Sequence, residues 1–286
     1  MQFFNTRAGF AAESSLYSDD ALAALMPRCL AQHAASPEAP LALGDGAAPC
    51  PPFIVCARGE PLAAAAPRLT AEPAAAMAAL AAIADRVAAL HAVEIVHRDL
   101  KPATIVRVHE SQSWALVDFG CAAPSGATPP SALLRASARS AAVAFAGCSS
   151  SQTGSRRGLL TCRGGCGADA MVPLAFSLAY AAPEVVAAFT AGDAAATAST
   201  AADVWSLGVV AFELLSGRRA FPPGTAVSVL MDAMVGVVLF PWEGASHAQL
   251  RPLGALQDAI LQCLSREPRE RPTAAAFLAQ VQAALP

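Results

Sequence analysis

The sequence predicts an α+β fold, with a mostly helical body and a small front end that contains strands. Apolar residues recur at steps of three and four over residues 77–90, which places them on one face of a long helix. Residues 204–215 are almost all apolar, as in a helix that is buried on every side. The apolar runs before these helices, such as residues 53–56, are short and typical of strands.

The first expected elements are short. Residues 1–4 (MQFF) are predicted to be the end of a strand, and residues 10–13 (FAAE) part of a helix. Residues 35–52 are rich in Pro, Gly and Ala and are predicted to be loop. The run FIVC at residues 53–56 follows a double proline and is predicted to be a buried strand.

The long helix comes next, with Thr70 as its expected cap and Pro73 in its first turn. Apolar segments around Ile105 and at residues 115–117 predict a hairpin, and Gly217 is the stop signal of the all-apolar helix. Two amphipathic helices are expected near the end of the chain. Their apolar faces consist of Leu253, Leu256, Ile260 and Leu264 in the first helix, and of Phe277, Val281 and Leu285 in the second.

The composition argues against several classes of protein. Hydrophobic residues make up 55% of the chain, but much of the excess is alanine, and there is no uninterrupted apolar stretch of about 18 residues, so no membrane span is expected. The net charge is −3 without a Lys/Arg stripe, so no nucleic-acid partner is expected. Eight unevenly spaced cysteines, without a signal peptide before them, predict reduced thiols and an intracellular, cytoplasmic location.

Six short motifs follow one another along the chain. They are HRDLKP at residues 97–102, DFG at 118–120, YAAPE at 180–184, DVWSLG at 203–208, FELLSG at 212–217 and RPT at 271–273. Any one alone is a weak signal, because a surface ion pair or an ordinary turn would account for it. In this order and spacing they resemble the catalytic lobe of the eukaryotic protein kinase superfamily, with an N-terminally truncated small lobe.

The resemblance implies a two-lobe Ser/Thr protein kinase-like domain. Residues 1–59 would be an incomplete N-terminal lobe, and residues 60–286 a mostly helical C-terminal lobe with a low-complexity activation-segment insert at about residues 121–172. ATP and Mg²⁺ are the implied cofactors, and a protein with Ser/Thr hydroxyls is the implied substrate. Asp99 would orient the hydroxyl and accept its proton, Lys101 would offset phosphoryl charge, and Asp118 would hold Mg²⁺.

Other residues match supporting positions of the family. Glu184 and Arg271 would form a buried ion pair, Asp203 would brace the catalytic loop through backbone hydrogen bonds, and Ser177 resembles the substrate-loop Thr. Residues 53–59 are similar to the strand and hinge beneath the adenine. Backbone groups near Ala57 and Gly59 would pair with the base and Val106 would form its floor, although apolar strand residues are also ordinary core.

The chain departs from the family pattern at the phosphate end of the site. It has no Gly-rich loop, and Glu13 matches the helix glutamate while Gln2 stands where the family has its ATP-contacting lysine. Thr104 replaces the Asn that holds a second Mg²⁺, and its hydroxyl is a weaker ligand. The insert contains Cys162 and Cys166, for which free thiols and a zinc knuckle are the alternatives.

Two functions are therefore expected from the resemblance. The first is an ATP-dependent Ser/Thr kinase-like domain with weak or no activity in the chain as given. The alternative is a pseudokinase, a binding or scaffold module that uses the same surface without turnover. Retention of Asp99, Lys101 and Asp118 favours the first function, whereas Gln2 and Thr104 favour the second. An internal position of Met1 in a longer chain would account for the missing phosphate loop.

Overall fold

A computed structural model describes residues 2–3, 14, 25–33, 53–126, 159–160, 172–173, 177–190, 199–222, 224–225, 227–234, 236, 239–243, 245–246 and 250–285. The chain divides into two compact units. The first comprises Met1–Ala65 and Pro102–Gly120, and the second Ala66–Lys101 and Cys121–Pro286. Residues 102–120 belong to the first unit because β6 (Ile105–Val108) pairs with β4 (Gly59–Pro61).

The first sheet of unit one is antiparallel, with β3 (Phe53–Cys56) between β1 (Gln2–Phe3) and β2 (Cys29–His33). The strands expected at residues 1–4 and 53–56 are thus confirmed, while sequence reasoning missed β2. Ile54 is 0% exposed, and half-buried cysteines from β2 and β3 pack against it.

A second antiparallel sheet in the same unit consists of β4 (Gly59–Pro61), β6 (Ile105–Val108) and β7 (Trp114–Leu116). Ile105 lies opposite Leu116, which confirms the expected hairpin. The Leu116 amide donates a hydrogen bond to the Leu25 carbonyl at 2.9 Å. A small apolar core forms on this sheet from Ala57, Val106, Val108, Ala115 and Val117.

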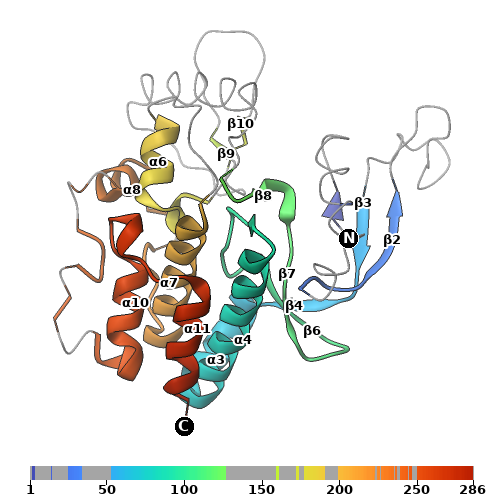
Figure 1. Ribbon diagram of the computed structural model, residues 1–286, viewed down its shortest axis with the longest axis horizontal. Coiled ribbons are helices and arrows are strands. Elements are labelled where there is room, and N and C mark those ends of the chain that lie inside the picture. The colour runs from blue at the N-terminus through green and yellow to red at the C-terminus, as the bar shows by residue number, and fades with distance from the viewer. Residues whose placement is uncertain are drawn as a thin grey trace, which may run out of the picture. The chain divides into compact units, whose positions relative to one another are not determined.

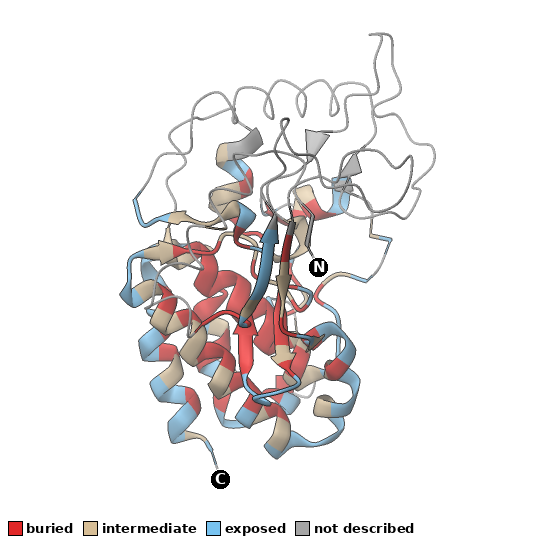
Figure 2. Ribbon diagram, turned by 90° about the vertical axis from the view of Figure 1, so that its right-hand side faces the viewer, coloured by how far each residue is buried: buried red, intermediate tan, exposed pale blue. Residues whose placement is uncertain are grey.

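The second unit is built on packed helices, α4 (Pro73–Ala92), α7 (Thr200–Ser216), α10 (Gln257–Cys263) and α11 (Ala274–Ala283). α4 packs against α7 and α11, and α10 packs against the same two helices. Figure 1 shows these helices side by side. α7 is buried along most of its length, and Figure 2 shows the buried residues gathered inside while exposed residues line the outer faces.

The remaining elements complete this description. α3 (Leu62–Ala71) leads into α4. The other short elements are β5 (Ile95–Val96), η1 (Phe119–Cys121), β8 (Ala123–Pro124), β9 (Leu159–Leu160), β10 (Val172–Pro173), η2 (Leu178–Tyr180), α6 (Pro183–Thr190), α8 (Val227–Met234), η3 (Arg251–Leu256) and η4 (Pro268–Glu270). β5 pairs with β8 and β9 pairs with β10, each in an antiparallel arrangement, and α6 packs on α8.

Helix boundaries confirm some expectations and correct others. Gly217 ends α7 in the left-handed conformation at φ 66°, as expected of a glycine stop. Pro73 begins α4, but Thr70 is not its cap: Thr70 lies inside α3, and its hydroxyl donates to the Leu214 carbonyl at 2.9 Å. Leu285 is 38% exposed and lies beyond α11, so it does not belong to that helix's apolar face.

Among the described residues, α4 alone is long and apolar enough to cross a membrane. The count of uninterrupted apolar residues missed it, because Asp85 and Arg86 lie in its middle. Its apolar side chains are core residues of unit two: Leu80, Ile83, Val87 and Leu90 are 0% exposed. A buried core helix passes the same test of length and hydropathy, so α4 does not establish a membrane span.

A cluster of aromatic rings packs against α7. Phe240 and Trp242 stack with centroids 4.9 Å apart, and Trp205 meets Phe240 edge-on at 5.1 Å. The Arg266 guanidinium lies 4.6 Å from the centre of the Phe240 ring and donates to the Glu243 carboxylate at 2.5 and 2.9 Å. Burial alone would raise the pKa of Glu243, but hydrogen bonds from Arg266 and from the Phe240 amide hold that pKa below its ordinary value.

The lowered pKa of Glu243 predicts an acid-sensitive contribution to stability. A depressed carboxyl pKa stabilises the fold above the unfolded-state value, and the contribution is lost as the pH falls from about 5 through the folded-state pKa. Glu243→Gln is therefore expected to flatten the fall of the free energy of unfolding below about pH 5, measured by urea unfolding at several pH values. Glu267→Gln, at an exposed position, is the control. Equal acid slopes in the two variants would contradict the assignment.

Candidate functional site

The loop of residues 97–102 follows β5 and is held by a buried carboxylate from α7. Asp203 is 1% exposed, and its two oxygens accept the amide hydrogens of His97 at 2.7 Å and Arg98 at 2.8 Å. This bracing role was expected from the sequence. Arg98 has φ 69°, a conformation that a non-glycine residue holds only where the surroundings impose it. The loop is thus clamped directly before Asp99.

His91 is a further member of this clamp that sequence reasoning missed. Its Nε2 lies 3.0 Å from Asp203 Oδ2, and its side chain is 10% exposed. His91 occupies the last turn of α4. The sequence signal that could have identified His91 is its position at the end of the helix that leads into the loop. Only the folded chain brings it to Asp203, which lies 112 residues away.

Asp99 and Lys101 meet Ser177 in the second unit. Lys101 Nζ donates to Asp99 Oδ2 at 2.5 Å and to Ser177 Oγ at 2.7 Å. The Ser177 amide donates to Asp99 Oδ1 at 3.0 Å. The side chains of Asp99 and Lys101 are 11% and 22% exposed, so both are partly screened from solvent. The structure thus brings together a carboxylate, an ammonium group and a hydroxyl from segments 76 to 78 residues apart.

A second polar cluster fixes the segment that carries Ser177. The Tyr180 hydroxyl donates to Glu213 Oε2 at 2.9 Å and accepts from Arg219 Nη1 at 2.9 Å, while Arg219 also reaches Glu213 at 3.1 Å. The Ser206 hydroxyl donates to the Tyr180 carbonyl at 2.8 Å. Burial, and then the Glu213 carboxylate, raise the pKa of Tyr180, so its hydroxyl keeps its proton. α7 therefore anchors both the loop of Asp99 and the segment of Ser177.

The expected ion pair of Glu184 and Arg271 is present. Arg271 donates to both carboxylate oxygens of Glu184, at 2.7 and 2.8 Å, in a bidentate arrangement. Its side chain is 0% exposed and also donates to the carbonyls of Ala201 and Ser265 at 2.9 and 2.8 Å. The pair ties α6 to the start of α7 and to the region after α10, which is a structural role.

The residues expected around the adenine lie together in the first unit. Ala57 and Val106 are 7% and 9% exposed and belong to one apolar cluster. The Ala57 amide donates a hydrogen bond to the Arg28 carbonyl at 2.8 Å, so this amide is already used within the protein. Gly59 lies opposite Val108, and a Cβ at this position would be 3.0 Å from the Arg107 carbonyl oxygen, which explains the glycine. Pairing of this segment with the base stays a prediction, and it would have to use other backbone groups than the Ala57 amide.

The residues expected around the phosphates and metal are only partly described. Gln2 lies in β1 opposite Ile54, and Glu13 lies outside the described residues. Asp118 follows β7, is exposed and has φ 67°, while Thr104 is 2% exposed and its carbonyl accepts from the Val117 amide at 3.0 Å. No group of three or more His, Cys, Asp or Glu side chains suited to a metal occurs in the described part of the chain.

The donor set still suits Mg²⁺. An exposed carboxylate such as that of Asp118 supplies the hard oxygen that Mg²⁺ prefers, and Mg²⁺ takes most of its other ligands from water and phosphate. The burial of Thr104 restricts the access of a metal to its hydroxyl. Cys162 and Cys166, the alternative zinc ligands, lie outside the described residues.

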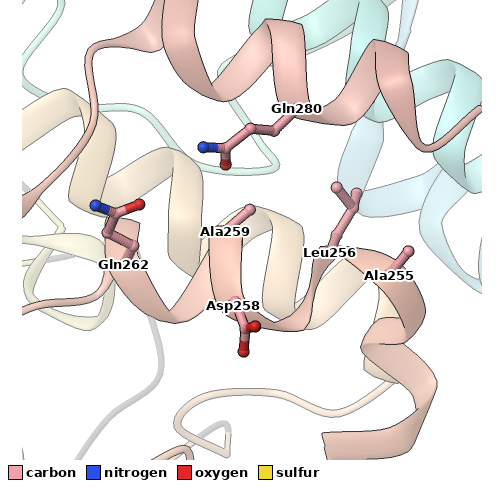
Figure 3. Close-up of a pocket in the computed structure, with 6 residues that line it drawn as sticks. All are labelled: Ala255, Leu256, Asp258, Ala259, Gln262 and Gln280. Carbon is pink, nitrogen blue, oxygen red and sulfur yellow. The ribbon is translucent and has the colours of Figure 1, made fainter.

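An open hollow of about 390 Å³ lies elsewhere in the second unit. Figure 3 shows that Gln280 reaches toward α10 from the helix on the opposite side. The lining residues are Ala255, Leu256, Asp258, Ala259, Gln262 and Gln280. None of them belongs to the motifs, and we assign this hollow no part in the candidate site.

The clamped loop, the Asp99–Lys101–Ser177 contacts and the Glu184–Arg271 ion pair lie at the motifs that resemble protein kinases. The family model described as the protein kinase domain matches residues 166–281, which include Glu184, Asp203 and Arg271 but not Asp99 or Asp118. Residues 166–281 therefore match a protein kinase superfamily domain, and the mixture of described helices and strands is consistent with an α+β kinase fold.

Two curated relatives are Ser/Thr or calcium/calmodulin-dependent kinases. The chain is 27% identical over 196 residues to the calcium/calmodulin-dependent protein kinase cmkA of Emericella nidulans, which covers 67% of this chain and 34% of the relative. It is 26% identical over 194 residues to a calcium and calcium/calmodulin-dependent serine/threonine-protein kinase of Lilium longiflorum. This match covers 67% of the present chain and 28% of the relative. The chain thus matches about a third of the length of these relatives and is distantly similar to Ser/Thr kinases.

Proposed function

We propose that this chain is a protein kinase domain that binds ATP with Mg²⁺ and slowly transfers the γ-phosphoryl group to Ser/Thr hydroxyls of a protein. The observation that carries the proposal is the contact of Asp99 with Lys101 and Ser177 in a loop clamped by Asp203. Similarity to Ser/Thr kinases supports the substrate class, and it supports an intracellular, cytoplasmic location as part of the same proposal.

The residues of this loop suit phosphoryl transfer, which needs positioning and charge neutralisation more than covalent chemistry. Asp99 Oδ2 and Oδ1 already accept two hydrogen bonds, so the carboxylate is held in a fixed orientation from which it can receive a hydroxyl proton. The Lys101 ammonium group lies beside it and would offset negative charge on the transferred group. Asp118 would hold Mg²⁺, which supplies charge neutralisation at the phosphates when bound.

Slow transfer follows from two substitutions. Gln2 carries no charge where the family has a lysine, so it cannot neutralise a phosphate. Thr104 offers a hydroxyl in place of an amide carbonyl and is 2% exposed. These same substitutions favour the second candidate function, a pseudokinase that binds partners through this surface without turnover.

An assay of radiolabelled phosphate transfer from ATP with Mg²⁺ to a generic Ser/Thr protein distinguishes a slow kinase from a pseudokinase. We expect a turnover well below about 1 s⁻¹, the low end for kinases. Asp99→Asn is expected to abolish it, because the amide cannot accept the hydroxyl proton. Asp258→Asn, an exposed position on α10, is the matched control and should leave the rate unchanged.

Each other result has a defined meaning. Turnover near 1 s⁻¹ or above that disappears in Asp99→Asn would contradict the slow rate, and transfer that survives Asp99→Asn would contradict the role of Asp99. Thermal stabilisation by ATP and Mg²⁺ without any transfer would support the pseudokinase. Loss of the Mg²⁺-dependent part of that stabilisation in Asp118→Asn would support Asp118 as the ligand.

A further inference from the structure

Two cysteines face each other across the first sheet. Cys29, the first residue of β2, is the direct partner of Cys56, the last residue of β3, in the antiparallel register. Side chains of directly opposite residues point to the same face of a sheet. Both cysteines also pack against Ile54. Neither is part of a disulfide in this structure.

The hydrogen bonds of the sheet decide how close these two residues are. The Ala57 amide donates to the Arg28 carbonyl, so Ala57 and Arg28 form a hydrogen-bonded pair just outside Cys56 and Cys29. Hydrogen-bonded and non-hydrogen-bonded pairs alternate along an antiparallel ladder. The register shifts between Cys29 and Ala31, but on the Arg28 side of the pair the alternation puts Cys29 and Cys56 in a non-hydrogen-bonded pair. Such pairs have Cα atoms about 4.5 Å apart. Disulfides accept Cα separations of about 4.4–6.8 Å, so this pair lies within the permitted range.

Both cysteines are at intermediate exposure, which gives reagents a route to them. The Cys29 thiol donates a long contact of 3.7 Å to the Ala31 carbonyl. Cys263 provides a contrast within the same chain. It is fully buried in the second unit, and burial raises the pKa of its thiol to about 12. A reagent that reacts with thiolates should therefore spare Cys263.

We propose that Cys29 and Cys56 form a reversible cross-strand disulfide that is made and broken by thiol–disulfide exchange. One thiolate attacks a low-molecular-weight disulfide such as oxidised glutathione, which releases one glutathione thiolate and leaves a mixed disulfide on the protein. The second cysteine thiolate attacks the protein sulfur of that mixed disulfide and releases the second glutathione. Two protein thiols are oxidised, one glutathione disulfide is reduced to two glutathione thiols, and a thiol reductant reverses the reaction.

The consequence for the sheet is a covalent link at the end of β3. The link would join β2 to β3 directly before Ala57, the segment that packs with Val106. A cross-link also removes conformational freedom from the unfolded chain. The oxidised protein is therefore expected to unfold at a higher temperature than the reduced protein. This proposal does not depend on the kinase assignment.

Peptide mapping of the full chain tests the proposal directly. Cleavage after Arg28, Glu38 and Arg58 separates Cys29 from Cys56, and a Cys50→Ser background removes the other cysteine of the second fragment. After incubation with oxidised glutathione and alkylation, we expect the fragments 29–38 and 39–58 to run as one linked species that separates on reduction. Cys263 should remain a thiol throughout.

Single substitutions provide the matched controls. Cys29→Ser and Cys56→Ser should each abolish the linked species and leave a glutathione adduct on the remaining cysteine. The rise in unfolding temperature on oxidation should disappear in both, while circular dichroism reports whether each variant is folded. Fragment 29–38 recovered without a link, with Cys29 either alkylated or joined to glutathione, would overturn the proposal. So would a link from Cys29 to any cysteine other than Cys56.

Discussion

Replacing Arg271 by methionine is expected to lower the free energy of unfolding by about 2–4 kcal/mol, because its charge-assisted hydrogen bonds to Glu184, whose side chain is 31% exposed, and to two carbonyl groups are lost. The guanidinium is 0% exposed and makes a bidentate contact with Glu184. Methionine has a similar apolar stem but no donors. It would therefore leave the Glu184 carboxylate and the carbonyls of Ala201 and Ser265 without their hydrogen bonds.

Urea unfolding of the wild type and of Arg271→Met measures this loss. Arg271→Lys should rescue little, because an ammonium group cannot reproduce the planar fork of the guanidinium. Arg269→Met, at an exposed position in η4, controls for the removal of a positive charge. A double-mutant cycle with Glu184→Gln isolates the pair itself. A loss below about 1 kcal/mol, the range of surface ion pairs, would contradict a structural role for this contact.

The second large effect is expected at Asp203. Asp203→Ala removes the acceptor of the buried His97 amide and of the part-buried Arg98 amide, together with the partner of His91. Each unsatisfied group costs about 1–3 kcal/mol, so the two amides together are expected to lower the free energy of unfolding by about 2–6 kcal/mol. Because Arg98 adopts φ 69° under this clamp, the loop is also expected to relax away from its present conformation.

Two measurements separate loss of stability from loss of the loop conformation. Urea unfolding gives the stability, and Asp203→Asn, which keeps one acceptor oxygen, should lie between the wild type and Asp203→Ala. Amide hydrogen exchange at His97 and Arg98 should speed up in both variants by more than it does at residues of α11. Asp258→Asn, at an exposed carboxyl, is the control. Unchanged exchange in the loop would show that Asp203 does not hold it.

Much of the second unit could be predicted from apolar periodicity. The face of α4 with Leu80, Ile83 and Val87 and the uniformly apolar α7 correspond to the most deeply buried residues. Their helices are long, so the pattern repeats often enough to be unambiguous. The cap was placed wrongly at Thr70, because a threonine before a proline is a typical cap, whereas here a contact with Leu214 keeps it inside α3.

The first unit was less predictable, since its strands are only two to five residues long. β2 (CLAQH) shows no clear alternation of apolar and polar residues. It could therefore be recognised as a strand from its pairing with β3 but not from its sequence. The return of residues 102–120 to this unit depends on pairing between β4 and β6, which are far apart in the chain. No local pattern encodes such a partner.

The order and spacing of short motifs alone predicted the resemblance to protein kinases and singled out Asp99, Lys101, Asp203, Glu184 and Arg271. These motifs are local runs whose residue types follow from the chemistry they serve, so they can be recognised without a fold. Tertiary structure decided which residues meet: His91 with Asp203, Ser177 with Asp99 and Lys101, Arg219 with Tyr180, and Cys29 with Cys56. These contacts depend on packing and strand register between segments distant in sequence. They exist only because burying the apolar faces of α4 and α7 and pairing β2 with β3 bring those segments together.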